Sequence, residues 1–338
     1  GLGDVYKRQV KAAIRPEIAA MQRTAKALAA LDCLTGLSRA ALKDRYVRPQ
    51  ITNSREGRIS IHDGRHPMVE HALKREMFVP NDTELNHTDQ EMIIITGPNM
   101  AGKSTYMRQV AVLTIMAQTG SFIPAKSASF APVDRIFTRV GAADDISTGQ
   151  STFMVEMKEV SHILCNATKN SLILLDEIGR GTSTYDGMSI ARAVVEYLNS
   201  KVHAYTLFAT HYHELSDMAA ENEHIKNYTV TVKERGKEIT FLRRIVPGSA
   251  DKSYGIHVAR LAGLPESLLK RADEILEGLE VEGIKEEPAA PVIRRETALN
   301  LFSSPIIDEL ADLDVMSKTP IEAMEILFRL SKEAKEGR

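Results

Sequence analysis

Two glycines, a lysine and a serine stand at the spacing of a phosphate-binding loop. The segment reads Gly97-Pro98-Asn99-Met100-Ala101-Gly102-Lys103-Ser104-Thr105, which fits the pattern Gly-x-x-x-x-Gly-Lys-Ser. The glycines allow the backbone to curl so that successive N–H groups face phosphate oxygens. Lys103 can reach the outer phosphates, and the Ser104 hydroxyl can bind Mg²⁺. The alternative is a chance match in a glycine-containing loop.

The elements on either side of the loop decide between these interpretations. Ile93, Ile94 and Ile95 precede it as a short buried-strand run. Apolar residues at roughly helical spacing follow from Met107 to Ala117, and Gly120 is a plausible cap for that helix. The positive end of such a helix points at the bound phosphates. Strand, loop and helix in this order favour a true phosphate loop.

Two carboxylates end a second apolar run. Residues 171–175 predict a buried strand, and Asp176 and Glu177 follow it directly. In P-loop proteins an acid at this place supports Mg²⁺, and a neighbouring carboxylate can act as general base on the attacking water. Capping of the next helix is the alternative role. The presence of Lys103 favours the catalytic interpretation.

His211 ends a third apolar run, residues 206–210. It could contact a γ-phosphate, although a lone histidine here is more often an ordinary buried residue. The group His211-x-His213-Glu214 lacks the His-Glu-x-x-His spacing of zinc sites and has no third strong ligand nearby, which disfavours a metal site.

Ser151 precedes a helix whose apolar positions begin at Phe153. Its hydroxyl can cap that helix, which stabilises it by about 1 kcal/mol. A helix N-terminus is also suited to contact a nucleotide. The sequence leaves both roles open.

The order of these elements predicts an α/β fold, in which buried strands alternate with amphipathic helices. A helical stripe runs from Val10 to Leu34, with Pro16 expected to interrupt it. In the first half of the chain, residues 1–9 fit no pattern, 46–90 predict short strands and loops, and 133–141 predict a strand. Further along, a loop is expected at 179–187, a helix at 188–198, a β-hairpin at 228–246 and helices within 254–280. The chain is then expected to pass through a Glu/Pro/Ala-rich linker at 281–304 to a last helical unit at 305–335.

Composition limits the class of protein. A chain of 338 residues suits about two domains. Its net charge of −2 gives no global electrostatic reason to bind nucleic acid, although a local patch remains open. Cys33 and Cys165 are too few for a disulfide framework and suit a reducing cytoplasm, and Cys165 is expected in the core. No apolar run is long enough for a transmembrane helix.

Several segments together resemble the ATPase domain of the MutS family of bacterial DNA mismatch repair proteins. They are Thr96–Arg108, Phe137–Asp145, Ser151–Met157, Leu175–Gly187 and Ala209–Leu215. The resemblance covers about residues 10–280 and implies a P-loop NTPase of the ABC-ATPase type with helical dimerisation segments. The implied division is the end of the lever helices at 1–45, the ATPase domain at 46–250, a helical dimerisation segment at 251–280 (with Lys252–Gly255), a linker at 281–304 and a C-terminal helical oligomerisation module at 305–338.

The resemblance also implies roles for single residues. Gly97 through Thr105 would bind the phosphates of ATP or ADP, with Asn99 and Lys103 near the β- and γ-oxygens. Ser104 and Asp176 would hold Mg²⁺, Glu177 would activate water, and His211 would position the γ-phosphate. Ser151 would complete the site of the partner in a homodimer, and Phe78 would stack on adenine. Arg243 stands where the family often has a histidine. A guanidinium can also stack on a ring, but because of this departure the sequence does not decide whether Arg243 stacks on adenine.

The implied function is a Mg²⁺-dependent ATPase that couples nucleotide state to binding of mismatched double-stranded DNA and to signalling through MutL in the cytoplasm, at the nucleoid. The family's mismatch-reading regions have no counterpart here, so the chain alone is expected to hydrolyse ATP weakly and not to recognise mismatches. Leu299, Leu301 and Phe302 are similar to sliding-clamp-binding peptides, without their leading glutamine; an accidental apolar group is the alternative.

Two other functions remain open. Another ABC-type machine is disfavoured, because the segment between Lys103 and Asp176 has no room for a coiled-coil insertion. The loop at 147–151 also lacks the Leu-Ser-Gly-Gly-Gln form of transporters. A non-enzymatic dimerisation and clamp-docking module that holds nucleotide as a structural ligand is the third possibility.

Overall fold

The computed structural model describes residues 1–53, 57–73, 77–98, 101–140, 151–235, 238–249 and 254–283. The chain divides into two units, residues 1–270 and 271–338. The described part of the second unit is the later portion of helix α9 (Glu266–Gly283), which runs slightly past the predicted start of the linker at 281. The rest of that linker, the clamp-like segment with Leu299, Leu301 and Phe302, and the predicted terminal module lie outside the described residues.

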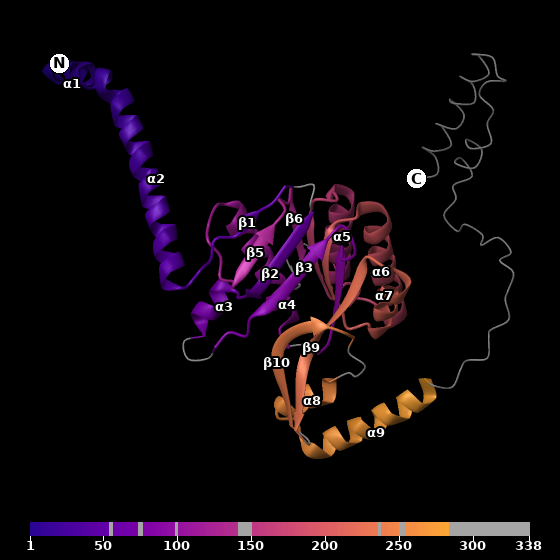
Figure 1. The fold of residues 1–338 in the computed structure, drawn as a ribbon. Coiled ribbons are helices and arrows are strands. Elements are labelled where there is room, and N and C mark those ends of the chain that lie inside the picture. The colour runs from indigo at the N-terminus through magenta and orange to yellow at the C-terminus, as the bar shows by residue number, and fades with distance from the viewer. Residues whose placement is uncertain are drawn as a thin grey trace, which may run out of the picture. The chain divides into compact units, whose positions relative to one another are not determined.

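A six-stranded sheet is the centre of the first unit (Figure 1). Its order is β10-β9-β4-β8-β7-β6, with β10 antiparallel at one edge and the other neighbours parallel. The strands are β4 (Met92–Thr96), β6 (Ile136–Arg139), β7 (Leu172–Asp176), β8 (Tyr205–Ala209), β9 (Ile225–Arg235) and β10 (Glu238–Pro247). Because both faces of a parallel sheet are covered, its central strands are continuously apolar. The predicted α/β class is confirmed.

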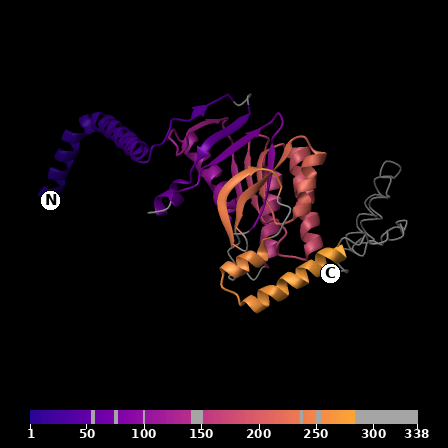
Figure 2. The same cartoon turned by 60° about the horizontal axis from the view of Figure 1, so that its bottom comes forward.

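Alternate residues of each central strand face two different apolar clusters. Ile93 and Ile95 of β4 belong to a cluster with helix α4 (Lys103–Gln118), whereas Met92 and Ile94 belong to a cluster with helices α5 (Thr152–Asn166) and α6 (Thr184–Tyr197). This is the period-2 alternation of a strand. Helices thus cover the sheet on both sides (Figure 2).

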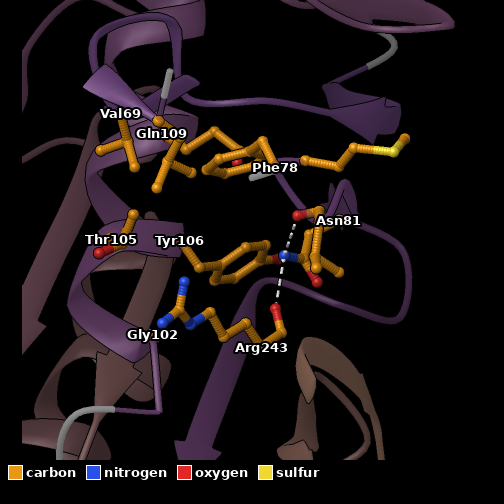
Figure 3. Close-up of a pocket in the computed structure, with 11 residues that line it drawn as sticks. Val69, Phe78, Asn81, Gly102, Thr105, Tyr106, Gln109 and Arg243 are labelled. Atoms are coloured by element: carbon orange, nitrogen blue, oxygen red, sulfur yellow. Dashed lines mark hydrogen bonds between the residues drawn. The ribbon is translucent and has the colours of Figure 1, made fainter. Parts of the chain in front are cut away.

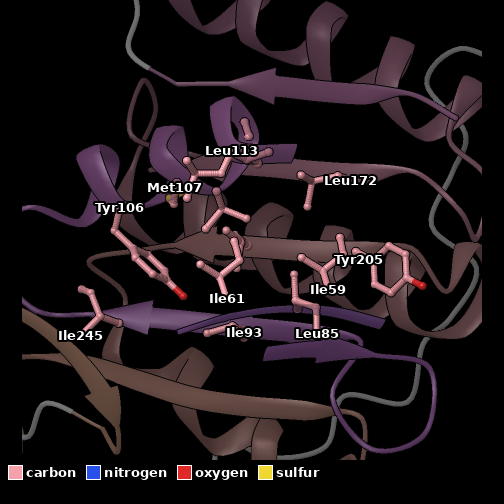
Figure 4. Packing of buried hydrophobic residues seen from close by; sticks show 14 of the residues in the cluster. Ile59, Ile61, Leu85, Ile93, Tyr106, Met107, Leu113, Leu172, Tyr205 and Ile245 are labelled. Atoms are coloured by element: carbon pink, nitrogen blue, oxygen red, sulfur yellow. The ribbon is translucent and has the colours of Figure 1, made fainter. Parts of the chain in front are cut away.

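A second, four-stranded sheet packs on the α4 side (Figure 4). Its order is β1-β5-β2-β3. The strands are β1 (Gln50–Ile51), β2 (Arg58–Gly64), β3 (Asn81–Asn86) and β5 (Ser127–Phe130). Figure 4 shows Ile59, Ile61 and Leu85 of this sheet in one cluster with Tyr106 and Met107 of α4.

Strand β3 lies in the range 46–90, for which short strands and loops were predicted without a place for this strand, and β5 was not predicted. The buried positions of β3 are Asn81, Thr83 and Leu85, so two of its three inward side chains are polar. They are satisfied by distant partners: the Thr83 hydroxyl, for example, donates to the Tyr106 hydroxyl at 3.0 Å. A polar inward face hides the apolar alternation by which such a strand is recognised.

The predicted hairpin is confirmed as β9 and β10, and its pairing is interrupted between Phe241 and Ile245. Arg243, inside this irregularity, has a φ of 56°. Left-handed backbone at a non-glycine residue is uncommon and requires support from its surroundings. The irregularity redirects Arg243 at the edge of the main sheet.

The helix predicted from Val10 is present as α1 (Leu2–Ile14), a 3₁₀ turn (Arg15–Glu17) and α2 (Ile18–Lys43). It begins earlier than predicted and includes most of the end at 1–9 that the sequence left unassigned. The change of helix type at Pro16 agrees with the expected interruption. The apolar stripe of this helix is exposed at Met21, Leu28 and Leu31. The remaining helical elements are α3 (Pro67–Ala72), a π-helical turn (Leu198–Val202), a 3₁₀ turn (His213–Asp217), α7 (Met218–Glu221) and α8 (Gly255–Leu261).

Two sequence predictions are wrong. Cys165 is exposed and not in the core, because α5 buries the face that carries Glu156, Val160 and Ile163. Helix α6 begins at Thr184 rather than at Met188, since Ser183 caps it by accepting a hydrogen bond from the Asp186 amide. Within the described residues, no helix combines the length and apolarity needed to span a membrane.

Candidate active site

The phosphate loop lies between β4 and α4, as predicted. Gly97 and Gly102 have φ values of 127° and 103°, and Gly102 is the N-cap of α4. Residues with a β-carbon rarely adopt these angles, so the curled backbone requires glycine at both positions. Asn99 and Met100 lie outside the described residues. The described part of the loop leads the chain directly into the N-terminus of α4, where N–H groups favour an anion.

Lys103 is folded back into the loop. Its side chain is buried, and its Nζ donates hydrogen bonds to the carbonyl oxygens of Gly97 and Pro98. Burial lowers the pKa of Lys103, while the Glu177 and Asp176 carboxylates oppose that change. The two acids therefore lie within electrostatic reach of the lysine, at the same end of the sheet.

Ser104 and Asp176 are in direct contact. The Ser104 hydroxyl donates to Asp176 Oδ2 at 2.5 Å. Burial raises the pKa of Asp176, an effect that the Ser104 hydrogen bond and the Lys103 charge partly offset. A hydroxyl and a carboxylate oxygen are ligands that Mg²⁺ accepts. Since the described residues contain no cluster of three or more His, Cys, Asp or Glu ligands, an ion here would complete its shell with water and phosphate oxygens.

Glu177 follows β7 in left-handed backbone, with a φ of 54°, and its amide donates to the Ala209 carbonyl at 2.9 Å. The carboxylate is 17% exposed and accepts a hydrogen bond from Arg180 Nη1 at 2.5 Å. Arg180 was not among the predicted site residues. Its position three residues beyond Glu177, with opposite charge, is a signal that the sequence contains.

His211 follows β8, the strand beside β7, so that it and Glu177 come from neighbouring strand ends. Burial lowers the pKa of His211; the Glu177 charge acts against this, and Arg180 and Lys103 act with it. The neutral imidazole is therefore favoured near pH 7. A neutral ring can still donate one hydrogen bond.

Ser151 caps α5, because its Oγ accepts a hydrogen bond from the Met154 amide at 3.2 Å. The predicted capping role is confirmed. The side chain is exposed and, among the described residues, has no contact with Lys103, Asp176 or Glu177. The structure of the single chain does not test the second role, contact with the nucleotide of a partner.

A cavity of about 170 Å³ adjoins the loop (Figure 3). Phe78, Gly102, Thr105 and Arg243 are among the residues that line it. Asn81 fixes its wall, since its side-chain amide donates to the Arg243 carbonyl at 3.1 Å and accepts from the Ile245 amide at 2.7 Å. The sequence analysis missed Asn81, and nothing local in the sequence pairs it with a strand so far along the chain.

Comparison with known proteins agrees with this geometry. The family model described as MutS domain V matches residues 93–280, more than half of the chain. The DNA mismatch repair protein MutS of Clostridium kluyveri is 51% identical over 97% of the chain, that of Acetivibrio thermocellus 50% over 96%, and that of Caldicellulosiruptor bescii 53% over 96%. The chain spans 38–39% of the length of these relatives. It therefore belongs to the MutS family and corresponds to the portion that contains domain V.

Proposed function

We propose that this chain is the ATP-binding and ATP-hydrolysing portion of a DNA mismatch repair protein and that it works with Mg²⁺. The observation that supports this most directly is the 2.5 Å hydrogen bond between Ser104 and Asp176, with Lys103 and Glu177 within electrostatic reach. A lysine, a hydroxyl and two acids at the N-terminus of one helix form the set that phosphoryl transfer to water requires.

Each side chain has a separate task in this proposal. The loop N–H groups and Lys103 bind the triphosphate, and Ser104 and Asp176 hold Mg²⁺, which supplies positive charge to the phosphate oxygens. Glu177 accepts the proton of the attacking water. Its carboxylate must first be released from Arg180, with which it is paired in the structure. Neutral His211 donates a hydrogen bond to the transferred phosphoryl group.

The cavity beside Gly102 is proposed to hold the adenine base. Phe78 offers an aromatic face, and the exposed Arg243 guanidinium can stack from another side. The volume of about 170 Å³ is of the order of one nucleobase and too small for a much larger ligand.

The biological context is proposed from the relatives, which are named DNA mismatch repair proteins. We infer a homodimer in which Ser151 contacts the nucleotide of the partner subunit. We propose that mismatched double-stranded DNA is bound by parts of the whole protein outside this chain. MutL and, through Leu299, Leu301 and Phe302, a sliding clamp are the expected protein partners, in the cytoplasm at the nucleoid.

The test is ATP turnover by this chain in Mg²⁺, measured over a range of protein concentrations. Turnover per chain should rise with concentration, and Glu177→Gln should abolish most of it while ATP still binds. Glu214→Gln, at an exposed acid near His211 in sequence, is the matched control and should behave as the unmodified chain. If Glu177→Gln hydrolyses ATP at the unmodified rate, Glu177 is not the base and the proposed mechanism is wrong.

A further inference from the structure

Both backbone groups of Gly179 are held by side chains from other elements. Its amide donates to Glu156 Oε1 at 2.6 Å, and its carbonyl oxygen accepts a hydrogen bond from the Tyr212 hydroxyl at 3.1 Å. Gly179 has a φ of 89°, an angle at which a side chain would be strained. A hydrogen bond to a carboxylate and one from a buried hydroxyl therefore fix one residue of a loop that has no regular secondary structure.

The surroundings of Gly179 leave it little freedom. Glu156 and Tyr212 are each 5% exposed. A β-carbon on Gly179 would lie 2.4 Å from the carbonyl oxygen of Gly187, at the start of α6. The backbone is thus packed against α6 on one side and anchored by α5 and by the segment after β8 on the others.

The charge of Glu156 is balanced within the fold. Arg139 of β6, itself buried, lies with Nη2 3.7 Å from Glu156 Oε2, and its Nε pairs with Glu159 Oε2 at 2.9 Å. A charged acceptor in a buried setting forms a stronger hydrogen bond than a neutral one.

Gly179 and its two hydrogen-bond partners lie close in sequence to proposed active-site residues. Gly179 stands between Glu177 and Arg180, the ion pair described above. Glu156 is on α5, the helix that Ser151 caps, and Tyr212 directly follows His211. Three segments that supply proposed active-site residues therefore meet at one glycine.

We propose that Glu156 is a positioning residue. Its hydrogen bond to the Gly179 amide fixes the position of the backbone that carries Glu177 and Arg180, and it connects that backbone to the N-terminal part of α5. Displacement of α5 when Ser151 meets the nucleotide of a partner is transmitted through this hydrogen bond to the catalytic acid of the same chain. The inference rests on the proposed ATPase function and on a composite dimeric site.

The test compares four variants of the full chain with the unmodified protein. Glu156→Ala removes the acceptor, and its turnover at saturating ATP should fall about ten- to a hundredfold, the effect expected for loss of a hydrogen bond to a charged group. Its ATP affinity should not change. Glu156→Gln keeps an oxygen that can accept from Gly179 and should restore turnover to within about threefold. Tyr212→Phe keeps the ring and should give a severalfold loss, and Ser161→Ala, at an exposed residue of α5, is the control and should be silent.

A purely structural role predicts a different pattern. It would lower the thermal unfolding temperature and the ATP affinity together, with no rescue by glutamine. Equal impairment of Glu156→Ala and Glu156→Gln, or unaltered turnover in Tyr212→Phe and Glu156→Ala, would overturn the positioning role. If Glu156→Ala does not fold, Tyr212→Phe and Glu156→Gln still decide between the two roles.

Coupling to α5 has its own measurement. If Ser151 and Glu156 act along one route, the variant carrying both Ser151→Ala and Glu156→Ala should lose less turnover than the product of the two single losses. Losses that multiply would show that the two residues act independently and would overturn the coupling. Failure of the ATPase proposal looks different, because the unmodified chain would then show no turnover. Turnover that depends on neither concentration nor Ser151 would instead remove the composite dimeric site.

Discussion

Ser151 allows its two roles to be separated, because one substitution preserves the cap and another removes it. Its hydroxyl is exposed and, within the described residues, accepts a hydrogen bond from the Met154 amide at 3.2 Å. Replacement by alanine should lower the free energy of unfolding by about 1 kcal/mol, the usual value of a serine cap. Replacement by aspartate should change it by only a few tenths, since aspartate caps as well as serine does and suits a helix N-terminus.

The two substitutions have the same effect on the second role. If Ser151 contacts the triphosphate of a partner, alanine lacks the hydroxyl and aspartate places a negative charge beside the phosphates. Loss of one such contact, about 1.5–3 kcal/mol, corresponds to roughly a ten- to hundredfold fall in turnover. Unfolding in urea measures the first effect, and ATP turnover against protein concentration measures the second. Ser151→Asp therefore combines normal stability with low turnover only if the serine acts on the partner.

The opposite result would refute this reasoning. If Ser151→Asp turns over ATP at the unmodified rate and Ser151→Ala is merely less stable, Ser151 is a helix cap and nothing else. A concentration-independent rate in the unmodified chain would lead to the same conclusion, because a self-contained site gains nothing from dimerisation. Binding of ATP to both variants must be measured alongside, so that a lost rate is not confused with a lost ligand.

Three further predictions concern backbone strain, the base pocket and pH. Gly179→Ala should lower the free energy of unfolding by about 2 kcal/mol more than Gly120→Ala does. Both glycines have a positive φ, but of the two only Gly179 has an atom close to the new β-carbon, at 2.4 Å. Equal losses in urea unfolding would remove the steric argument. Phe78→Ala should weaken ATP binding by about ten- to a hundredfold, which corresponds to the stacking of one base, and Arg243→Ala should weaken it less. The affinity of both variants for inorganic triphosphate should stay constant. A parallel loss of triphosphate affinity would mean that the cavity does not hold the base. Burial lowers the pKa of His87 in the folded chain. As the pH falls, His87 of the unfolded chain therefore takes up a proton before His87 of the folded chain does, and the free energy of unfolding should decline below about pH 6.5. Urea unfolding should show a smaller decline for His87→Phe, which keeps an aromatic ring at that place; an identical decline in both proteins would contradict the assignment.

The parts of the fold that the sequence predicts well are those whose cause is local. Ile93, Ile94 and Ile95 form a fully buried strand because a parallel sheet covered on both faces needs apolar residues throughout. The phosphate loop follows from glycines that permit positive φ and from the strand and helix that flank them. Ser151 as a cap depends only on its own helix.

What the sequence does not predict depends on partners far along the chain. Strand β3 was missed because Asn81 and Thr83 are buried through hydrogen bonds to β10 and α4, not through apolarity. Cys165 was misplaced because the apolar run around it is wider than the face that α5 buries. Arg243 could be named from its position in the family, but its left-handed backbone is held by Asn81 of β3, the edge strand of the other sheet.

Gly179 belongs to this second group and shows why site residues alone describe an active site incompletely. The sequence identifies Glu177 from its place after an apolar strand, yet nothing local indicates that the loop behind it is held by Glu156 and Tyr212. The proposed general base must lie close to the attacking water, and small displacements of a catalytic group lower the reaction rate by large factors. A carboxylate on a backbone that can shift would therefore contribute little to the rate. In the proposed mechanism the side chains that hold the loop are therefore as much a condition for hydrolysis as the carboxylate, and the same hydrogen bonds form the proposed route from α5 to Glu177.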